Sequence, residues 1–336
     1  MPALAVAAAL RAEGAEVTFV GGERAEAELV PAAGFELRRI SARGLSRTNP
    51  FAAAGALGLA AKGTAAAARI LREVGAHVVL GGGGYVAGPV GLAAVAQRIP
   101  LVLTEADSHL GFANRRLAPF ARGVCLAFPI EGRTGDKYLV TGRPVPPPAT
   151  DRGAARERFA LADGERCVLV FGGSLGARTI YEAAIAAFGD VPYRVLHAAG
   201  RRDHDDLVAR VPDGGHYDLR PYIDEFAEAL LASDLVVARA GGSIFEVAAA
   251  GRPAILVPYP HATADHQTGN ARWMERAGAA VVVADAELTA ERLRSEVDTL
   301  LLDDARLRAM SEASRSLARP DAAEAIARQV LQAAGR

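Results

Sequence analysis

Three glycine-rich segments follow apolar runs and precede helical patterns: GGGGY (81–85), GGSLG (172–176) and GGS (241–243). Glycine leaves backbone N–H groups uncovered, and the N-terminus of the following helix favours an anion, so such turns can hold a phosphate. None of them continues into the Gly-Lys-Ser/Thr of a P-loop or has dinucleotide-fingerprint spacing. Each alone also suits a tight turn, but three of them in two domains predict a nucleotide in a cleft between the domains.

Glu246 has two interpretations. Ser243 and Glu246 have the spacing of a capping box, in which the serine caps a helix and the glutamate reaches back to its first N–H. A carboxylate one turn into a helix can also accept hydrogen bonds from both hydroxyls of a ribose. The residues by themselves leave both open.

The segment HATADHQTGN (261–270) is polar although it follows a buried apolar run. His266, Gln267 and Asn270 can contact sugar hydroxyls, whereas Asp265 can also begin a helix as its N-cap. His261, Asp265 and His266 lack a fourth ligand for a metal. No Ser-His-Asp or Cys-His nucleophile can be assembled from the spacing. We therefore predict no metal site.

Composition limits the function classes. The 336 residues include 38 Lys+Arg and 39 Asp+Glu, a formal net charge of -1, which argues against a nucleic-acid partner. The length and the 51% hydrophobic content predict two globular domains. Cys125 and Cys167, the only cysteines, cannot make a zinc site alone and suit a reducing compartment.

Short β-branched runs alternate with Ala- and Leu-rich helical segments, which predicts α/β domains with doubly wound parallel sheets. The predicted strands are 16–20, 77–80, 100–104, 124–128, 137–141, 166–171, 193–198, 234–239, 253–258 and 279–285. The proline-rich segment TGRPVPPPATD (141–151) cannot continue a central strand or a helix, so it is interpreted as a linker. A final helix is predicted after Pro320.

The start of the chain differs from that of a usual doubly wound domain. Pro2 suits a first helical position, so a helix stands where a strand and a glycine-rich loop are expected. Either the domain begins with a helix, or its first strand and loop lie upstream of Met1. Further along, the apolar segment 45–71 is flanked or interrupted by Arg43, Arg47, Lys62 and Arg69. It predicts an amphipathic helix on its own sheet, or one that rests on an anionic membrane surface.

Five segments occur in an order that resembles the MurG family: GGGGYVAGP (81–89), GGSLGAR (172–178), YIDEF (222–226), AGGSIFEVAAAGRPAILVPYP (240–260) and HATADHQTGNA (261–271). The resemblance implies a GT-B fold, in which two Rossmann-like domains face each other across a cleft. It implies an N-terminal acceptor and membrane-side domain of residues 1–143 plus 320–336, a linker at 144–150, and a UDP-sugar-binding domain at 151–319.

The family's activity is inverting transfer of N-acetylglucosamine from UDP-GlcNAc to the muramyl 4-hydroxyl of lipid I, giving lipid II for peptidoglycan. The resemblance thus implies UDP-GlcNAc, lipid I and an anionic membrane surface as partners, with no cofactor. It places the enzyme peripherally on the cytoplasmic face of the cell membrane. A base takes the hydroxyl proton, and UDP leaves with its charge stabilised by backbone N–H groups and helix ends.

The resemblance also implies site residues. The donor set is Gly173, Ser174, Tyr222, Ile223, Glu246, His266, Gln267 and Asn270, together with Arg143 in place of a family arginine that is Pro146 here. In this set Tyr222 and the Ile223 backbone frame uracil, and Glu246 binds the ribose. The acceptor set is Gly83, Gly84, Tyr85, Glu105 and Asn114.

The chain departs from the family pattern in its first half. The family's favoured general base is a histidine that would lie upstream of Met1, so no catalytic residue is assigned and we expect poor turnover by the chain that begins there. Residues 104–107 read TEAD where many members have HEQN. Two alternatives stay open: an isomerase resembling UDP-GlcNAc 2-epimerases, which share the fold, and a UDP-sugar-binding protein without activity.

Overall fold

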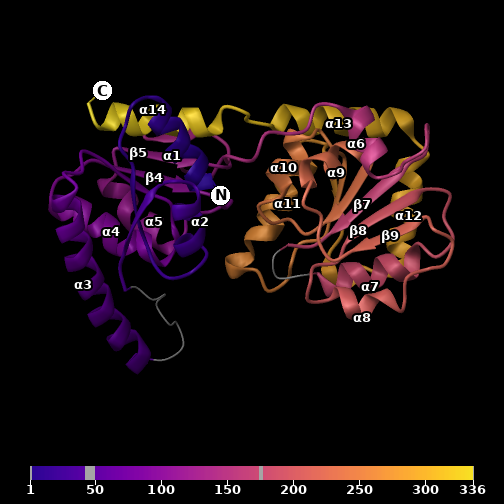
Figure 1. The fold of residues 1–336 in the computed structure, drawn as a ribbon, viewed down its shortest axis with the longest axis horizontal. Coiled ribbons are helices and arrows are strands. Elements are labelled where there is room, and N and C mark those ends of the chain that lie inside the picture. The colour runs from indigo at the N-terminus through magenta and orange to yellow at the C-terminus, as the bar shows by residue number, and fades with distance from the viewer. Residues whose placement is uncertain (1, 42–49, 174–176, 336) are drawn as a thin grey trace. The chain divides into compact units, whose positions relative to one another are not determined.

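The computed structural model of the chain describes residues 2–41, 50–173 and 177–335, with 50–60 as backbone only. The chain folds into two compact units, Met1–Pro144 with Arg319–Arg336 (unit 1) and Val145–Ala318 (unit 2). Both contain parallel strands connected by helices, as the alternating pattern predicts (Figure 1). The proline-rich segment 141–151 contains the change from one unit to the other.

The elements of unit 1 are α1 (Pro2–Ala12), β1 (Thr18–Gly21), α2 (Glu26–Ala32), β2 (Glu36–Arg39), α3 (Pro50–Glu73), β3 (Val79–Gly81), α4 (Gly84–Ala96), β4 (Leu101–Glu105), α5 (Phe112–Leu117), η1 (Ala118–Phe120), β5 (Gly123–Leu126), β6 (Tyr138–Val140) and α14 (Ala322–Ala333). They include a parallel pair β1-β2 and a parallel sheet β3-β4-β5-β6. Val20 of β1 and Val79 of β3 nevertheless contribute to one apolar cluster. The predicted helices at Pro2 and after Pro320 are confirmed, and they lie side by side as α1 and α14 (Figure 1).

The elements of unit 2 are α6 (Arg152–Arg158), β7 (Cys167–Phe171), α7 (Arg178–Ala187), β8 (Arg194–Ala198), α8 (His204–Val208), β9 (Tyr217–Arg220), α9 (Phe226–Ala232), β10 (Leu235–Ala238), α10 (Ile244–Ala249), β11 (Ala254–Leu256), η2 (Thr263–Asp265), α11 (His266–Arg276), β12 (Ala280–Val282), η3 (Asp285–Glu287), α12 (Ala290–Leu301) and α13 (Asp304–Leu317). They surround one parallel sheet in the order β12-β11-β10-β7-β8-β9.

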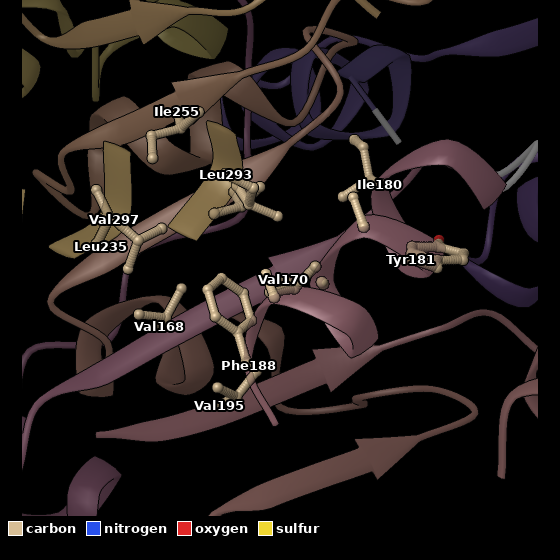
Figure 2. Packing of buried hydrophobic residues seen from close by; sticks show 14 of the residues in the cluster. Val168, Val170, Ile180, Tyr181, Phe188, Val195, Leu235, Ile255, Leu293 and Val297 are labelled. Carbon is tan, nitrogen blue, oxygen red and sulfur yellow. The ribbon is translucent and has the colours of Figure 1, made fainter. Parts of the chain in front are cut away.

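The core of unit 2 explains its strand sequences. Every residue of β7, β10 and β11 is buried, because helices cover both faces of the sheet. On one face, Val168 and Val170 pack with Phe188, which directly follows α7, and with Leu293 of α12 (Figure 2). Tyr181 of α7 belongs to the same cluster, and its hydroxyl is the polar end of an otherwise apolar group.

All ten predicted strands are present, within one to three residues at either end, and two further strands were not predicted. These are β2 and β9, which lie at the edges of their sheets. The predicted helix around 45–71 is present as α3, which begins at Pro50. Arg43 and Arg47 lie outside the described residues, so their predicted place beside a membrane is not described.

Candidate functional site

The strand order of unit 2 creates a position where a ligand can enter. From β7 the chain builds outward through β8 and β9, then returns to the other side of β7 with β10 and continues through β11 and β12. Ligands of such sheets bind outside the carboxyl ends of the strands where the order reverses, which here is between β7 and β10. Phe171 and Ala238 pair in register, so the segments 172–173 and 239–243 leave the sheet at the same level.

The turn after β7 requires glycine at its first position. A Cβ atom on Gly172 would overlap the Tyr181 Oη and lie 2.8 Å from Ala177 Cβ. Gly173 is exposed, and a Cβ atom there would meet no atom within 4 Å among the described residues. Ser174, the next residue predicted at this turn, lies outside the described residues. The turn therefore packs tightly below Gly172 and is open above Gly173.

Glu246 lines a cavity of about 390 Å³ within unit 2. Three further carboxylate residues, Asp224, Glu225 and Glu228, also line it, together with Phe226 and the proline run 146–148. Carboxylates accept hydrogen bonds from hydroxyl and N–H donors, whereas they repel phosphate. The cavity thus suits a sugar or a base, and a diphosphate fits the glycine turn better.

The capping-box interpretation of Glu246 is wrong. Ser243 has helical backbone angles (φ -65°, ψ -16°), and its side chain makes no capping hydrogen bond. An N-cap residue normally has extended backbone angles, which aim its hydroxyl at the N–H groups of the first turn. The serine half of the capping box is therefore not formed.

Tyr222 and Ile223 follow β9 and differ in exposure. The Tyr222 side chain is 59% exposed, with the Arg201 guanidinium carbon 5.7 Å from its ring centroid. The Ile223 side chain is 4% exposed. An open aromatic face beside a buried anchor gives a planar ligand one surface on which to stack.

Two of the predicted sugar-binding residues tie the polar loop to the sheet. Gln267 accepts a hydrogen bond from the Tyr259 N–H through Oε1 at 3.0 Å, and Asn270 donates Nδ2 to the Ala240 carbonyl at 3.1 Å. The buried Oδ1 of Asn270 has no partner among the described residues. His266 Nδ1 donates to the Thr263 carbonyl at 2.9 Å. The Gln267 and Asn270 contacts hold the start of α11 against the segments that follow β11 and β10.

Asp265 is not the helix cap that the sequence allowed. It has left-handed backbone angles (φ 53°, ψ 31°) and makes no side-chain capping bond. Its Oδ1 accepts instead from the Thr268 hydroxyl at 2.7 Å. The backbone conformation again decides where the side chain can reach.

Arg239, which the sequence analysis did not single out, braces this face of unit 2. Its guanidinium pairs with Asp285 and donates to the Val257 and Pro258 carbonyls, both at 3.2 Å. Arg239 is 4% exposed. Inside the protein, its ion pair joins the end of β10 to η3, and its two carbonyl contacts join the end of β10 to the segment that follows β11. The only sequence signal was a charged residue at the end of a predicted buried strand.

The predicted acceptor residues lie in unit 1. Gly83 and Gly84 have positive φ angles of 79° and 75°, which only glycine adopts readily, and α4 begins at Gly84. The Tyr85 hydroxyl donates to Glu26 Oε1 at 3.0 Å, and the Gly22 N–H donates to the same oxygen at 2.9 Å. This pairing joins residues 59 positions apart and was missed, because nothing in the local sequence announces it.

The pKa values of Glu26 and Tyr85 are both shifted from their ordinary values. Hydrogen bonds from the backbone of Glu26 itself, and then from Gly22 and Tyr85, lower the pKa of Glu26. Burial, followed by the hydrogen bond to Glu26, raises the pKa of Tyr85. Tyr85 therefore stays a protonated phenol, and its hydroxyl proton is directed at Glu26.

Glu105 and Asn114 are buried and bound to each other. Glu105 Oε2 accepts from Asn114 Nδ2 at 2.9 Å and from the Gly111 N–H at 2.8 Å. Its Oε1 accepts from the N–H groups of Ala106 and Asp107 at 3.0 and 3.2 Å. With 7% exposure for Glu105 and 2% for Asn114, this pair shapes the loop between β4 and α5.

The remaining site predictions concern Arg143 and metals. Arg143 belongs to unit 1 and the donor residues belong to unit 2, so its role beside Pro146 stays a prediction. Among the described residues, no three His, Cys, Asp or Glu side chains are grouped as metal ligands. In the same part of the chain, no helix is long and apolar enough to cross a membrane.

Comparison with known proteins identifies both units. Residues 1–126 match the N-terminal domain of glycosyltransferase family 28, and residues 167–326 match its C-terminal domain. The chain is 40% identical to the UDP-N-acetylglucosamine--N-acetylmuramyl-(pentapeptide) pyrophosphoryl-undecaprenol N-acetylglucosamine transferase of Moorella thermoacetica, over 98% of this chain and 95% of the relative. It is 41% identical to the transferase of the same name from Salinibacter ruber, over 100% and 94%.

Solved structures agree with the similarity to these transferases. The crystal structure of Acinetobacter baumannii MurG has a TM-score of 0.82 and 30% identity, over 98% of this chain and 95% of that one, which confirms the GT-B fold. A UDP-GlcNAc 2-epimerase from Neisseria meningitidis, covering 98% and 96%, reaches a TM-score of 0.68 at 14% identity and shares the fold alone. From its matched domains and its full-length relatives, the chain belongs to glycosyltransferase family 28 and, within it, to the MurG transferases.

Proposed function

We propose that this protein transfers N-acetylglucosamine from UDP-GlcNAc to the muramyl 4-hydroxyl of lipid I and so forms lipid II. The observation that carries the proposal is the full-length similarity to transferases of that name, at 40% identity over 98% of the chain. The 4-hydroxyl oxygen forms a bond to the anomeric carbon while the bond from that carbon to the UDP phosphate breaks. The hydroxyl proton passes to a base, and UDP leaves as the anion.

In the proposed donor complex, unit 2 holds the three parts of UDP-GlcNAc in three places. The base lies by Tyr222 and the Ile223 backbone, and the ribose hydroxyls donate to Glu246 in the carboxylate-lined cavity. The diphosphate lies above Gly173 and the N-terminus of the ten-residue helix α7, where backbone N–H groups stabilise its charge. Gln267, His266 and Asn270 lie beside the sugar.

Glu246 provides the sharpest test of donor binding. Titration calorimetry with UDP-GlcNAc should show Glu246→Ala binding roughly 10- to 150-fold more weakly than the wild type, because each hydrogen bond to a charged group contributes about 1.5–3 kcal/mol. Glu157→Gln, a change at an exposed carboxylate in the same unit, should bind normally. Equal affinity of Glu246→Ala and wild type would remove Glu246 from the site.

The reaction products distinguish a transferase from an epimerase and from a binding protein without activity. A transferase releases UDP only when lipid I is present and makes a lipid-linked disaccharide. An epimerase converts UDP-GlcNAc without a lipid, and a binding protein leaves UDP-GlcNAc unchanged with or without lipid I. Chromatography of the sugar nucleotide after incubation with and without lipid I therefore decides among the three.

We propose further that unit 1 binds the acceptor and rests on an anionic membrane surface at the cytoplasmic face of the cell membrane. Gly83, Gly84 and Tyr85 would meet the acceptor pyrophosphate, with Glu105 and Asn114 shaping the neighbouring loop. The membrane part is supported by exposed Leu92 of α4, Phe112 of α5 and Phe120 of η1, at 52%, 47% and 63% exposure. Arg115 and Arg116 lie on α5, where their positive charge suits anionic lipid.

Vesicle co-sedimentation tests this surface. Wild-type protein should sediment with vesicles containing phosphatidylglycerol and not with pure phosphatidylcholine. The double variant Phe112→Ser/Phe120→Ser should lose most of this binding, while Val208→Ser, a matched exposed apolar position in unit 2 at 51% exposure, should keep it. Unchanged sedimentation of the double variant would move the membrane contact to another surface.

A further inference from the structure

Tyr181 is a buried residue whose polar end points at the proposed donor site. It lies in the first turn of α7 and is 1% exposed. Its Oη lies directly beneath Gly172, where a glycine Cβ would overlap it, and the Gly172 backbone makes a hydrogen bond to it. Burial nevertheless raises the pKa of Tyr181 to about 12, so the phenol stays neutral at physiological pH.

The turn above Tyr181 needs a support. Glycines 172 and 173 have more backbone freedom than other residues, and this freedom must be lost before the turn can hold an anion. The N-cap residue of α7 is Ala177, whose side chain cannot supply the hydrogen bond that usually supports such a turn. The hydroxyl beneath Gly172 therefore fixes the turn where a cap does not.

Tyr181 is itself held by neutral rings on the sheet. Its ring centroid lies 4.8 Å from that of His197 on β8, and His197 Nδ1 lies 2.8 Å from the Tyr217 Oη on β9. His197 is fully buried, and burial lowers its pKa to about 3. The support is thus rigid and uncharged, so it can position the turn without adding charge near a diphosphate.

We propose that Tyr181 is a positioning residue for nucleoside diphosphates, holding the Gly172–Gly173 turn in the conformation that receives the diphosphate. The inference rests on the donor-binding role proposed above and adds a residue to it. It distinguishes two parts of the donor: the diphosphate depends on Tyr181, whereas the nucleoside, held by Tyr222, Ile223 and Glu246, does not.

The test compares UDP with uridine, which lacks the phosphates. Calorimetry of the full chain should show Tyr181→Phe binding UDP about 5-fold more weakly, since one hydrogen bond contributes roughly this factor, with uridine affinity unchanged. Tyr193→Phe is the matched control. It removes a hydroxyl from another buried tyrosine of unit 2, 4% exposed, whose Oη donates to Asp298 Oδ1 and not to the turn, and it should leave the affinity for both ligands unchanged.

The outcomes are separable. Equal UDP affinity in Tyr181→Phe and wild type, or a parallel loss for UDP and uridine, overturns the inference and leaves the proposed function standing. Wild-type protein that binds neither ligand overturns both. Should Tyr181→Phe not fold, amide hydrogen exchange of the wild-type protein replaces it. The Gly172 N–H, held by the Tyr181 hydroxyl, should exchange slowly without UDP, and exchange at the rate of a free loop amide would overturn the inference.

Discussion

Acid should destabilise unit 2 through the buried imidazole of His197. Burial lowers the pKa of His197 from 6.5 to about 3 in the folded protein, whereas the unfolded chain titrates at the ordinary value. Below pH 6.5 the unfolded state therefore binds more protons than the folded state, so stability is complete above pH 6.5 and is lost as the pH falls towards 3. The slope approaches about 1.4 kcal/mol per pH unit, which gives a loss of about 2 kcal/mol between pH 7 and pH 5.

Urea unfolding monitored by tryptophan fluorescence measures the loss of stability of unit 2. Trp273 is the single tryptophan and lies on α11 of unit 2, so its emission follows the unfolding of that unit. His197→Gln should be less stable at pH 7 but should lose about 2 kcal/mol less than wild type on going to pH 5. The difference between the two proteins removes the contribution of titrating carboxylates.

A surface histidine supplies the control for His197. His261→Gln changes an exposed residue of the same unit and should follow the wild-type pH dependence. If wild type and His197→Gln lost the same stability between pH 7 and pH 5, protonation of His197 in the core would carry no free-energy cost. The buried-imidazole reasoning would then be refuted.

Two further predictions concern packing. Gly251→Ala should lower the free energy of unfolding by about 1–3 kcal/mol in urea, because φ is 61° and the new Cβ would meet the Arg315 side chain, including Nη1 at 2.9 Å. Gly278→Ala, with φ 79° but no atom within 4 Å, should cost less, and the opposite order would refute the contact argument. Cys125 and Cys167 are buried with their thiol pKa raised to about 12, so a thiol reagent at pH 8 should label neither before unfolding and both in urea. Labelling of a thiol in the folded protein at the rate of free cysteine would contradict their burial.

The fold was predictable where a strand is buried on both faces, because its sequence is then a continuous apolar run. β7 reads CVLVF and β10 reads LVVA, and both are buried throughout. β2 reads ELRR and β9 reads YDLR, and these edge strands were missed. An edge strand forms one ladder and exposes part of its surface, so polar residues are tolerated there and the apolar signal is lost.

The site was predictable only as far as local spacing carries information. The glycine turns stand out in the sequence because the apolar run, the glycines and the following helical pattern are all neighbours along the chain. The support of Gly172 by Tyr181 depends instead on a side-chain rotamer, and the pairing of Glu26 with Tyr85 depends on the fold bringing distant segments together. The capping box at Ser243 failed for a related reason: spacing specifies which residues could bond, while the backbone angles decide whether they do.

The return of the chain to unit 1 has a consequence for biosynthesis. Ile326 and Val330 of α14 pack against Val102 and Cys125 of the unit 1 sheet. A ribosome must therefore complete all of unit 2 before it makes the helix that closes unit 1. At about 5–20 residues per second, the nascent first half waits roughly ten seconds or longer with that apolar surface uncovered. The half that is translated first is finished last, and this interval is when a chaperone would be needed.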